Sequence, residues 1–242
     1  RDTRRMAESR ETTVDGVRFG AFAPQGWKME LVGIADAGDK WARCRETALL
    51  AEALGYDSIW VYDHFHNVPT PAHEAVFECW TVMAALAEGT STIRLGQMVS
   101  CTSYRPPTLT AKMTASIDVI SGGRLEWGVG AGWYDHEYKA YGYEFPAPKV
   151  RIGMLREAVE IVTAMWREPD THYEGRYYKV AGAQCDPKPL QQPRPPVWIG
   201  HAVLTVSDLG RSTQWWTGIG MREVERNEHV VVLELRGGTH LV

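Results

Sequence analysis

The stretch Asp57-Ser58-Ile59-Trp60-Val61-Tyr62-Asp63-His64-Phe65-His66 decides the fold of this chain. Residues 58–62 form a short apolar run, which is typical of a parallel strand covered on both faces. An acid and two imidazoles, Asp63, His64 and His66, follow almost at once. Since the carboxyl ends of the strands carry the chemistry in βα folds, the sequence predicts a functional site here.

Strand-like and helix-like segments alternate along the rest of the chain. Apolar runs predict further strands over residues 17–23, 93–99, 124–130 and 196–200. Apolar residues at helical spacing predict helices over residues 39–54, 73–88, 106–120 and 151–167, with Asp39 as the first N-cap. Five strands joined by helices require right-handed parallel crossovers. The predicted fold class is therefore α/β, an incomplete TIM (β/α) barrel of about five βα units.

Composition restricts the partners and the compartment. The 242 residues carry a net charge of -4, and no Lys or Arg run is longer than Arg4-Arg5, so we expect no nucleic-acid partner. Four cysteines lack CxxC spacing, which favours reduced thiols and a cytoplasmic protein. No apolar stretch approaches the roughly 18 residues of a membrane span or resembles a signal peptide, and residues 1–16 are expected to form a flexible tail.

Several longer strings of the sequence carry a family resemblance. They are FGAFAPQGW at residues 19–27, WVYDHFH at 60–66, RLGQMV at 94–99 and SGGRLEWGVGAGW at 121–133, followed by RIGMLREAVEI at 151–161 and YEGRYY at 173–178. Over residues 17–200 the chain resembles the bacterial luciferase-like monooxygenase superfamily. Within it, the deazaflavin (coenzyme F420) dependent oxidoreductases look closest. The resemblance implies a truncated barrel that transfers a hydride to or from a small organic substrate.

The resemblance also implies where the cofactor lies. The ring of F420, or alternatively of FMN, is expected over the carboxyl ends of the strands, beside Asp63, Met98, Val99, Ser100, Thr102, Ala131, Gly132, Trp133 and His136. His64 is the predicted catalytic residue, because an imidazole titrates near physiological pH and exchanges a proton readily. The alternative is a loop histidine that is merely hydrogen-bonded to a backbone carbonyl.

The glycines at positions 128, 130 and 132 allow the backbone to approach a planar cofactor closely. Their GxGxG spacing differs from a Rossmann fingerprint, and residues 133–136 are not expected to begin a helix. Close packing inside a barrel is the alternative explanation, above all for Gly128.

An aromatic residue departs from the pattern of some relatives. In the family, the deazaflavin enzymes that oxidise sugar phosphates have a glutamate where Trp133 stands, so the resemblance disfavours a sugar phosphate as the substrate. His136 and Glu137 remain as polar groups nearby. Trp27, Trp133 and Tyr134 form either an apolar wall for a hydrophobic substrate or part of the core.

The C-terminal segment follows a different pattern. HAVLTVSDLGRS at residues 201–212 and VVLELRGGTH at 231–240 look like half of a vicinal-oxygen-chelate (glyoxalase/bleomycin-resistance) module. This implies a short α+β βαββ half-module over residues 201–242, joined directly to the barrel segment of residues 17–200. His201 and Glu234 match two metal ligands of that family, but two ligands are too few for a site. His66, His73 and Glu74 also lack metal-binding spacing, so no metal is predicted.

Three functions are therefore open. The first is an F420- or FMN-dependent oxidoreductase or monooxygenase that acts on a small-molecule substrate. The second is a truncated or chimeric, non-enzymatic chain that pairs its open sheet edges in a homodimer. The third is a metal-dependent glyoxalase-like or dioxygenase-like activity of residues 201–242.

Overall fold

The computed structural model describes residues 18–202, 208–218, 222–226, 231–235 and 239–241. The chain divides into two compact units, Arg1–Trp198 and Ile199–Val242. This division lies two residues before the predicted boundary between residues 200 and 201. The predicted tail, residues 1–16, lies outside the described residues.

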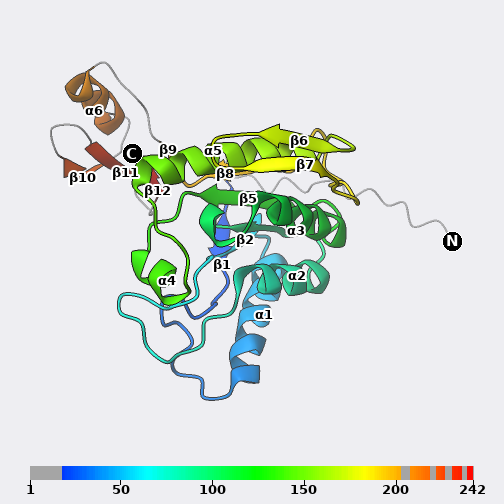
Figure 1. Cartoon of the computed structure of the whole chain (residues 1–242). Coiled ribbons are helices and arrows are strands. Elements are labelled where there is room, and N and C mark those ends of the chain that lie inside the picture. The colour runs from blue at the N-terminus through cyan, green and yellow to red at the C-terminus, as the bar shows by residue number, and fades with distance from the viewer. Residues whose placement is uncertain (1–17, 203–207, 219–221, 227–230, 236–238, 242) are drawn as a thin grey trace. The chain divides into compact units, whose positions relative to one another are not determined.

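A parallel sheet forms the centre of the first unit (Figure 1). Its strands are β1 (Gly20–Phe22), β2 (Ser58–Val61), β3 (Arg94–Gln97), β4 (Ser100–Cys101), β5 (Leu125–Gly130) and β8 (Val197–Ile199). Strands β1, β2, β3 and β5 are neighbours in this order and run parallel, β4 pairs in parallel with β5, and β8 also pairs with β5. The α/β class with a parallel sheet is confirmed, while the incomplete barrel stays a prediction.

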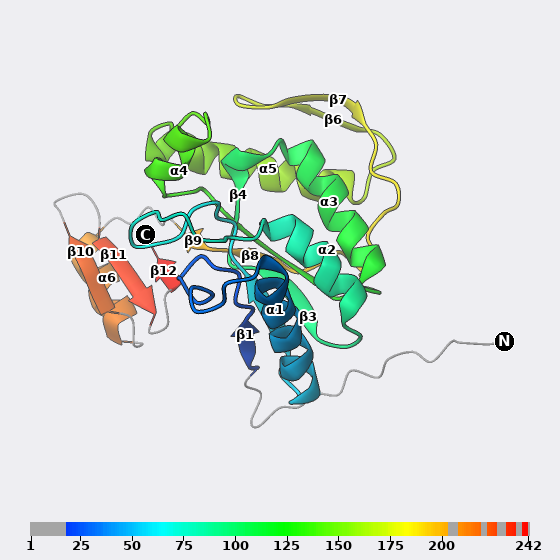
Figure 2. The same ribbon diagram turned by 90° about the horizontal axis from the view of Figure 1, so that it is seen from below.

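The helices follow one another in an arc along the sheet, from α1 through α2 and α3 to α5 (Figures 1 and 2). They are α1 (Ala37–Ala53), α2 (Cys79–Gly89), α3 (Pro107–Ile120), α4 (Asp135–Ala140) and α5 (Pro148–Met165), with a 3-10 turn η1 at Thr102–Tyr104. The core contains apolar side chains of the strands and of the helices, such as Ile59, Leu95, Trp127, Met83 and Ile161. Helix α3 begins with proline in its first turn, as predicted.

Three helices begin elsewhere than the sequence predicts, and one of them is α5, which begins at Pro148 and not at residue 151. Asp36, not Asp39, is the N-cap of α1, and its carboxylate accepts a hydrogen bond from the Asp39 N–H (3.0 Å). The helix predicted from residue 73 begins only at Cys79. The backbone N–H of Phe77 is bonded to the Gln25 carbonyl (3.0 Å) and its carbonyl to the Gln25 amide (2.5 Å), so Phe77 cannot join a helix.

The strand predicted over residues 93–99 is interrupted. It ends at Gln97, a cis peptide joins Met98 to Val99, and β4 follows. Gly96 pairs with Glu126 and Cys101 with Gly130, so five residues on one strand oppose four on the other. The extra residue is a β-bulge, a feature that is common beside active sites.

The segment after α5 contains a hairpin that is not among the predicted strands. Strand β6 (Thr171–Glu174) pairs antiparallel with β7 (Lys179–Ala183). Tyr173 and Val180 of this hairpin pack against the core of the unit.

The second unit contains β9 (His201–Ala202), α6 (Leu209–Gly218), β10 (Arg222–Arg226), β11 (Val231–Leu235) and β12 (Thr239–Leu241). Its sheet has the order β10-β11-β12-β9, with β9 parallel to β12 and the other pairs antiparallel. This unit has one strand more than the predicted βαββ order, and its likeness to a vicinal-oxygen-chelate module stays a prediction. The side chains of His201 and Glu234 lie outside the described part of the chain.

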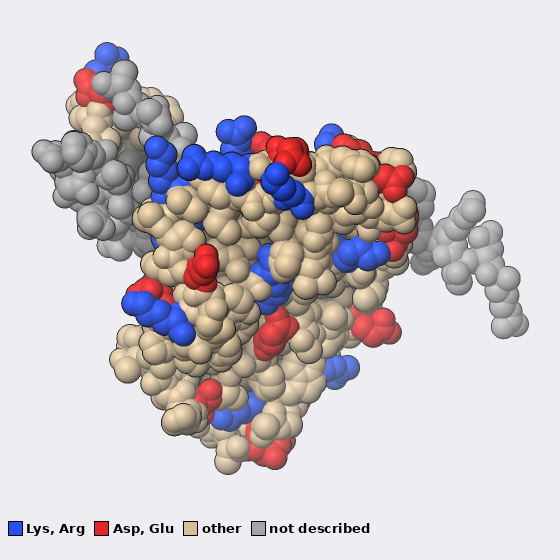
Figure 3. All heavy atoms as spheres, in the orientation of Figure 1, with Lys and Arg blue, Asp and Glu red and all other residues tan. Residues whose placement is uncertain are grey.

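Charges of both signs are distributed over the face of the molecule in Figure 3, with Lys and Arg side chains following one another along its upper edge. Within the part of the chain that the structure describes, no helix combines the length and the apolar character needed to cross a membrane.

Candidate active site

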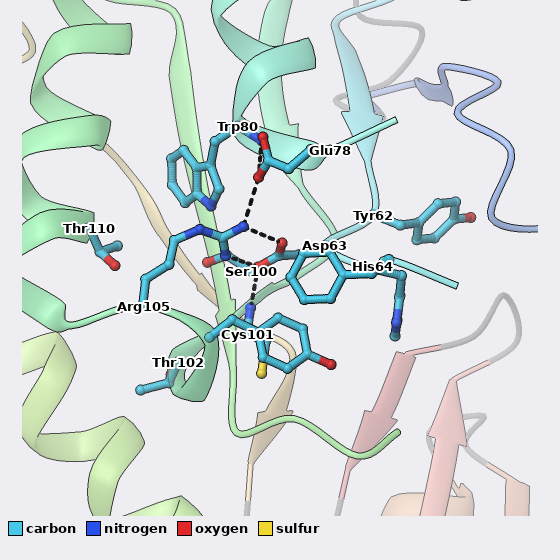
Figure 4. Close-up of polar contacts among 12 residues, drawn as sticks. Tyr62, Asp63, His64, Glu78, Trp80, Ser100, Cys101, Thr102, Arg105 and Thr110 are labelled. Atoms are coloured by element: carbon cyan, nitrogen blue, oxygen red, sulfur yellow. Dashed lines mark hydrogen bonds and ion pairs between the residues drawn. The ribbon is translucent and has the colours of Figure 1, made fainter. Parts of the chain in front are cut away.

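His64 lies just beyond the carboxyl end of β2, where the predicted site was expected. The strand ends at Val61, so Asp63 and His64 belong to a loop and their side chains point in different directions (Figure 4). The His64 Nδ1 atom lies 2.8 Å from Oε2 of Glu137. One face of the imidazole stacks on Trp27, with 4.4 Å between the ring centroids and 2° between the planes.

Glu137 is the centre of this hydrogen-bond network. It lies on α4, is completely buried, and accepts bonds from the backbone N–H groups of Phe65 and His66 (2.8 Å each) and from the Tyr104 hydroxyl (2.7 Å). Burial raises its pKa, but the bonds from His64, His66 and Tyr104 outweigh burial and hold the pKa below the ordinary value. Glu137 is thus a carboxylate, and His64 presents its Nδ1–H to it and keeps Nε2 available.

Helix α4 itself contradicts one expectation. Residues 133–136 were not expected to begin a helix, yet α4 starts at Asp135. An acidic residue in the first turn of a helix is favourable there. The helix is what places Glu137 beneath His64.

Two further aromatic rings approach the imidazole. Trp133 and Tyr134 approach it edge-on, with centroids at 5.8 Å and 5.9 Å, and they stack on each other at 5.1 Å. Trp133 is 53% exposed, whereas the Tyr134 hydroxyl and the Trp27 Nε1 atom are buried without a hydrogen-bond partner. We call Trp27, Trp133 and Tyr134 the aromatic cluster.

Asp63 points away from His64, into the protein (Figure 4). Its carboxylate accepts two bonds from the Arg105 guanidinium (2.7 and 3.0 Å) and one from the Cys101 N–H (2.8 Å). Arg105 also bonds Glu78 (2.8 Å) and lies 5.8 Å from the centroid of the Trp80 ring. Complete burial raises the pKa of Asp63, and the Arg105 charge opposes that rise. Asp63 therefore joins the end of β2 to β4 and to the start of α3.

The predicted cofactor residues around the bulge differ in their exposure. Met98 is 40% exposed at the end of β3, and Val99 is partly buried. The hydroxyls of Ser100 and Thr102 are buried and donate to the carbonyls of Gly128 (2.6 Å) and Gly130 (2.9 Å), respectively. Ser100 and Thr102 thereby fix β4 and η1 against β5.

Ala131 and Gly132 follow the end of β5. Ala131 is buried, and Gly132 has a φ of +77°, a conformation that favours glycine. A Cβ on Gly132 would lie 1.9 Å from the Tyr138 hydroxyl and 2.8 Å from the Cys101 Sγ. This close approach draws the end of β5 against β4 and α4.

His136 does not contact His64. Its Nε2 atom lies 3.0 Å from Nδ1 of His66 in an exposed pair. Among the described residues, no group of three His, Cys, Asp or Glu side chains is placed to hold a metal ion.

A small cavity lies behind the strand ends and is lined by Trp80, Ser100, Cys101, Thr102, Arg105, Pro107, Thr110, Trp127, Val129, Ala158 and Val162. Trp127 and Val129 alternate along β5 with the glycines at 128 and 130, so the cavity is on the sheet face that packs on α3 and α5. It is separate from the aromatic cluster around His64.

Three residues that contact Asp63, Arg105 or Glu137 were not predicted from the sequence. Arg105, Tyr104 and Glu78 were not singled out, although Arg105 directly precedes the Pro106-Pro107 helix start. Position after a strand end was the available signal for Tyr104 and Arg105, since they follow β4 as Asp63 follows β2.

Comparison with known proteins relates this chain to a family. The model of the luciferase-like monooxygenase family matches residues 17–206. An F420-dependent glucose-6-phosphate dehydrogenase of Amycolatopsis mediterranei is 34% identical over 153 residues, which are 62% of this chain and 45% of that protein. The chain thus spans less than half the length of that relative.

Solved structures share the fold. The coenzyme F420 dependent tetrahydromethanopterin reductase of Methanopyrus kandleri has 25% identity and a TM-score of 0.60, over 77% of this chain and 50% of that one. The oxygenating constituent of 3,6-diketocamphane monooxygenase of Pseudomonas putida, in complex with FMN, has 20% identity and a TM-score of 0.60, over 77% and 52% of the two chains. With its family model matched over most of its length, this chain belongs to the luciferase-like monooxygenase family, whose members are oxidoreductases.

Proposed function

We propose that this chain carries the reaction centre of an F420-dependent oxidoreductase, with FMN as the alternative cofactor, and that His64 is its proton acceptor and donor. The observation that carries the proposal is the His64–Glu137 pair at the carboxyl end of β2. The F420-dependent relatives support the choice of deazaflavin, and the FMN-containing monooxygenase supports the alternative.

The residues at the strand ends fit a planar, largely apolar ring. Strands β1, β2 and β3 are neighbours, and just beyond or at their carboxyl ends lie Phe22, His64 and Met98. Phe22 is 44% exposed and stacks on Tyr62 at 4.6 Å and 4°, and Met98 is a second exposed apolar side chain. Flat and polarisable groups of this kind favour stacking. These residues, with Ala131 and Gly132 at the end of β5, would hold the ring.

Once bound, the deazaflavin supplies a carbon that accepts or returns a hydride. The protein supplies the matching proton transfer. When the carbinol C–H hydride of an alcohol leaves, the O–H proton moves to Nε2 of His64 and a carbonyl forms. In the opposite direction His64 returns the proton to the carbonyl oxygen. Glu137 holds Nδ1–H throughout, which keeps Nε2 directed outward and places a negative charge beside the imidazolium.

The test is a spectrophotometric titration of the chain with F420 and, separately, FMN, followed by turnover with an alcohol panel. Saturable binding at micromolar cofactor is the expected result. His64→Gln should retain that binding and lose a factor of about 10² to 10⁴ in turnover, the usual contribution of a positioned acid or base. His172→Gln, in the exposed part of hairpin β6–β7, is the matched control.

Two results would contradict the proposal. One is a chain that binds neither cofactor. The other is equal turnover in the His64 and His172 variants. The non-enzymatic chain, the metal-dependent activity, the homodimer and the cytoplasmic location stay predictions, and no observation on the described residues favours either of the two competing functions.

A further inference from the structure

The side chains around His64 affect which substrate can bind as well as the transfer of a proton. The aromatic cluster presents Trp133, which is 53% exposed, edge-on to the imidazole at 5.8 Å. Trp133 is stacked on Tyr134 at 5.1 Å and 23°, so its indole is held by a second ring. A large apolar side chain left half exposed beside a buried His–Glu pair is a contact surface for an apolar group.

Three Lys and Arg side chains on the surrounding elements already have hydrogen-bond or ion-pair partners. Arg105 is bound by Asp63 and Glu78, and Lys139 by Asp135. Arg151 donates to the carbonyls of Gly132 and Pro146, and its guanidinium lies 4.0 Å from the Phe145 ring centroid.

One further cation lies close to the cluster. The Lys28 ammonium lies over the rings of Trp27 and Tyr62, at 5.4 and 5.1 Å from their centroids. Recognition of a phosphate dianion relies on several charge-assisted bonds, for which bidentate guanidinium is the preferred donor. Among the described residues around His64, no unpaired guanidinium is available for that role, and the nearest buried charge is the carboxylate of Glu137.

We infer that this site takes an uncharged alcohol or carbonyl compound with an apolar ring or branched chain, and not a sugar phosphate. The inference rests on the proposed function, because it assigns the reacting oxygen to the space beside His64 Nε2. The apolar part of the substrate lies against the indole of Trp133, and the hydroxyl or carbonyl oxygen faces the imidazole. The Trp133 side chain thus determines specificity.

The experiment measures the equilibrium binding of substrate candidates without cofactor. Its result is therefore independent of turnover. Saturation-transfer NMR titrations of the full chain use 1-phenylethanol, cyclohexanol, glucose 6-phosphate and inorganic phosphate. We expect the two alcohols to bind and the two phosphates to bind at least tenfold more weakly. Trp133→Ala should weaken 1-phenylethanol binding by about 3- to 10-fold, the usual contribution of an aromatic contact.

Two variants make the result specific. Trp133→Phe keeps an aromatic surface and should retain most of the affinity. Trp215→Ala removes a tryptophan on α6 that is 60% exposed, in the other unit, and should change nothing. Tighter binding of either phosphate than of both alcohols would overturn the inference, and so would equal effects of the Trp133 and Trp215 alanine variants. Failure of F420 and FMN titration alongside normal alcohol binding would instead remove the proposed function.

Discussion

Replacing Glu137 with alanine removes one acceptor from four donors. The Phe65 and His66 N–H groups, the Tyr104 hydroxyl and His64 Nδ1 all lose their partner at 2.7 to 2.8 Å. Removing one partner from a buried ionic network costs about 3–5 kcal/mol. A unit of this size loses about 2–4 °C of melting temperature per kcal/mol, so we expect a decrease of about 6–20 °C. Thermal unfolding followed by circular dichroism measures it, with the exposed Glu144→Ala as the control.

Glu137→Gln separates the fold from the chemistry. The amide oxygen can still accept from Phe65 and His66, so the expected destabilisation is only about 1–2 kcal/mol. The amide NH₂ then faces His64, whose Nδ1 must become the acceptor, and the ring proton moves to Nε2. A change of tautomer of this kind can lower kcat by about 10⁴. Nitrogen-15 NMR of His64 reports the tautomer directly. An alanine variant that melts within about 2 °C of the wild type, or an unchanged tautomer in the glutamine variant, would refute this reasoning.

Three further predictions follow from neighbouring residues. Gly132→Ala should cost several kcal/mol because the new Cβ meets the Tyr138 hydroxyl at 1.9 Å, whereas Gly142→Ala, at φ +76° with open space around it, should cost only the left-handed conformation, about 1–2 kcal/mol. Chemical denaturation compares the two, and equal costs would contradict the steric argument. Asp63→Asn should lose about 3 kcal/mol from the buried pair, and Asp135→Asn, in the exposed pair with Lys139, about 0.3–0.5 kcal/mol. Since hydrogen bonds hold the pKa of Glu137 below its ordinary value of 4.5, its stabilisation is present above about pH 4.5 and lost as pH falls through the lowered pKa. Melting temperatures from about pH 7 to about pH 3 should therefore fall less steeply in Glu137→Gln than in the wild type, and parallel curves would exclude this assignment.

The fold was predictable where local signals are strong. The apolar run of residues 58–62 gave β2, and Pro106-Pro107 gave the start of α3. The late start of α2 was not predictable, because the backbone of Phe77 is held by Gln25, 52 residues earlier in the chain. The hairpin β6–β7 was predictable in part, because Tyr173 and Val180 favour strands, but Gly175 and Gly182 interrupt that local signal.

The site residues also divide into those that local sequence signals predict and those whose role depends on distant contacts. His64 could be found because it follows a strand end, which is a local property. Its partner Glu137 is 73 residues away and depends on α4, whose start the sequence did not reveal. Asp63 was expected near the cofactor, but its carboxylate is directed to Arg105, and that pairing depends on the packing of β4 and α3 against β2.

The bulge between β3 and β4 makes the length of this segment matter as well as its composition. Before the bulge Leu95 pairs with Leu125, and after it Ser100 pairs with Val129. The residues that face the helices therefore have odd numbers before the bulge and even numbers after it. Deleting one residue between 97 and 100 would remove the extra residue, so Ser100 would continue a regular ladder opposite Val129 and the bulge that exposes Met98 would be lost. In an alignment of homologues, gaps between positions 97 and 100 should therefore be absent. The number of residues in this segment is a constraint in addition to the side chain of Met98, which is proposed to contact the cofactor ring.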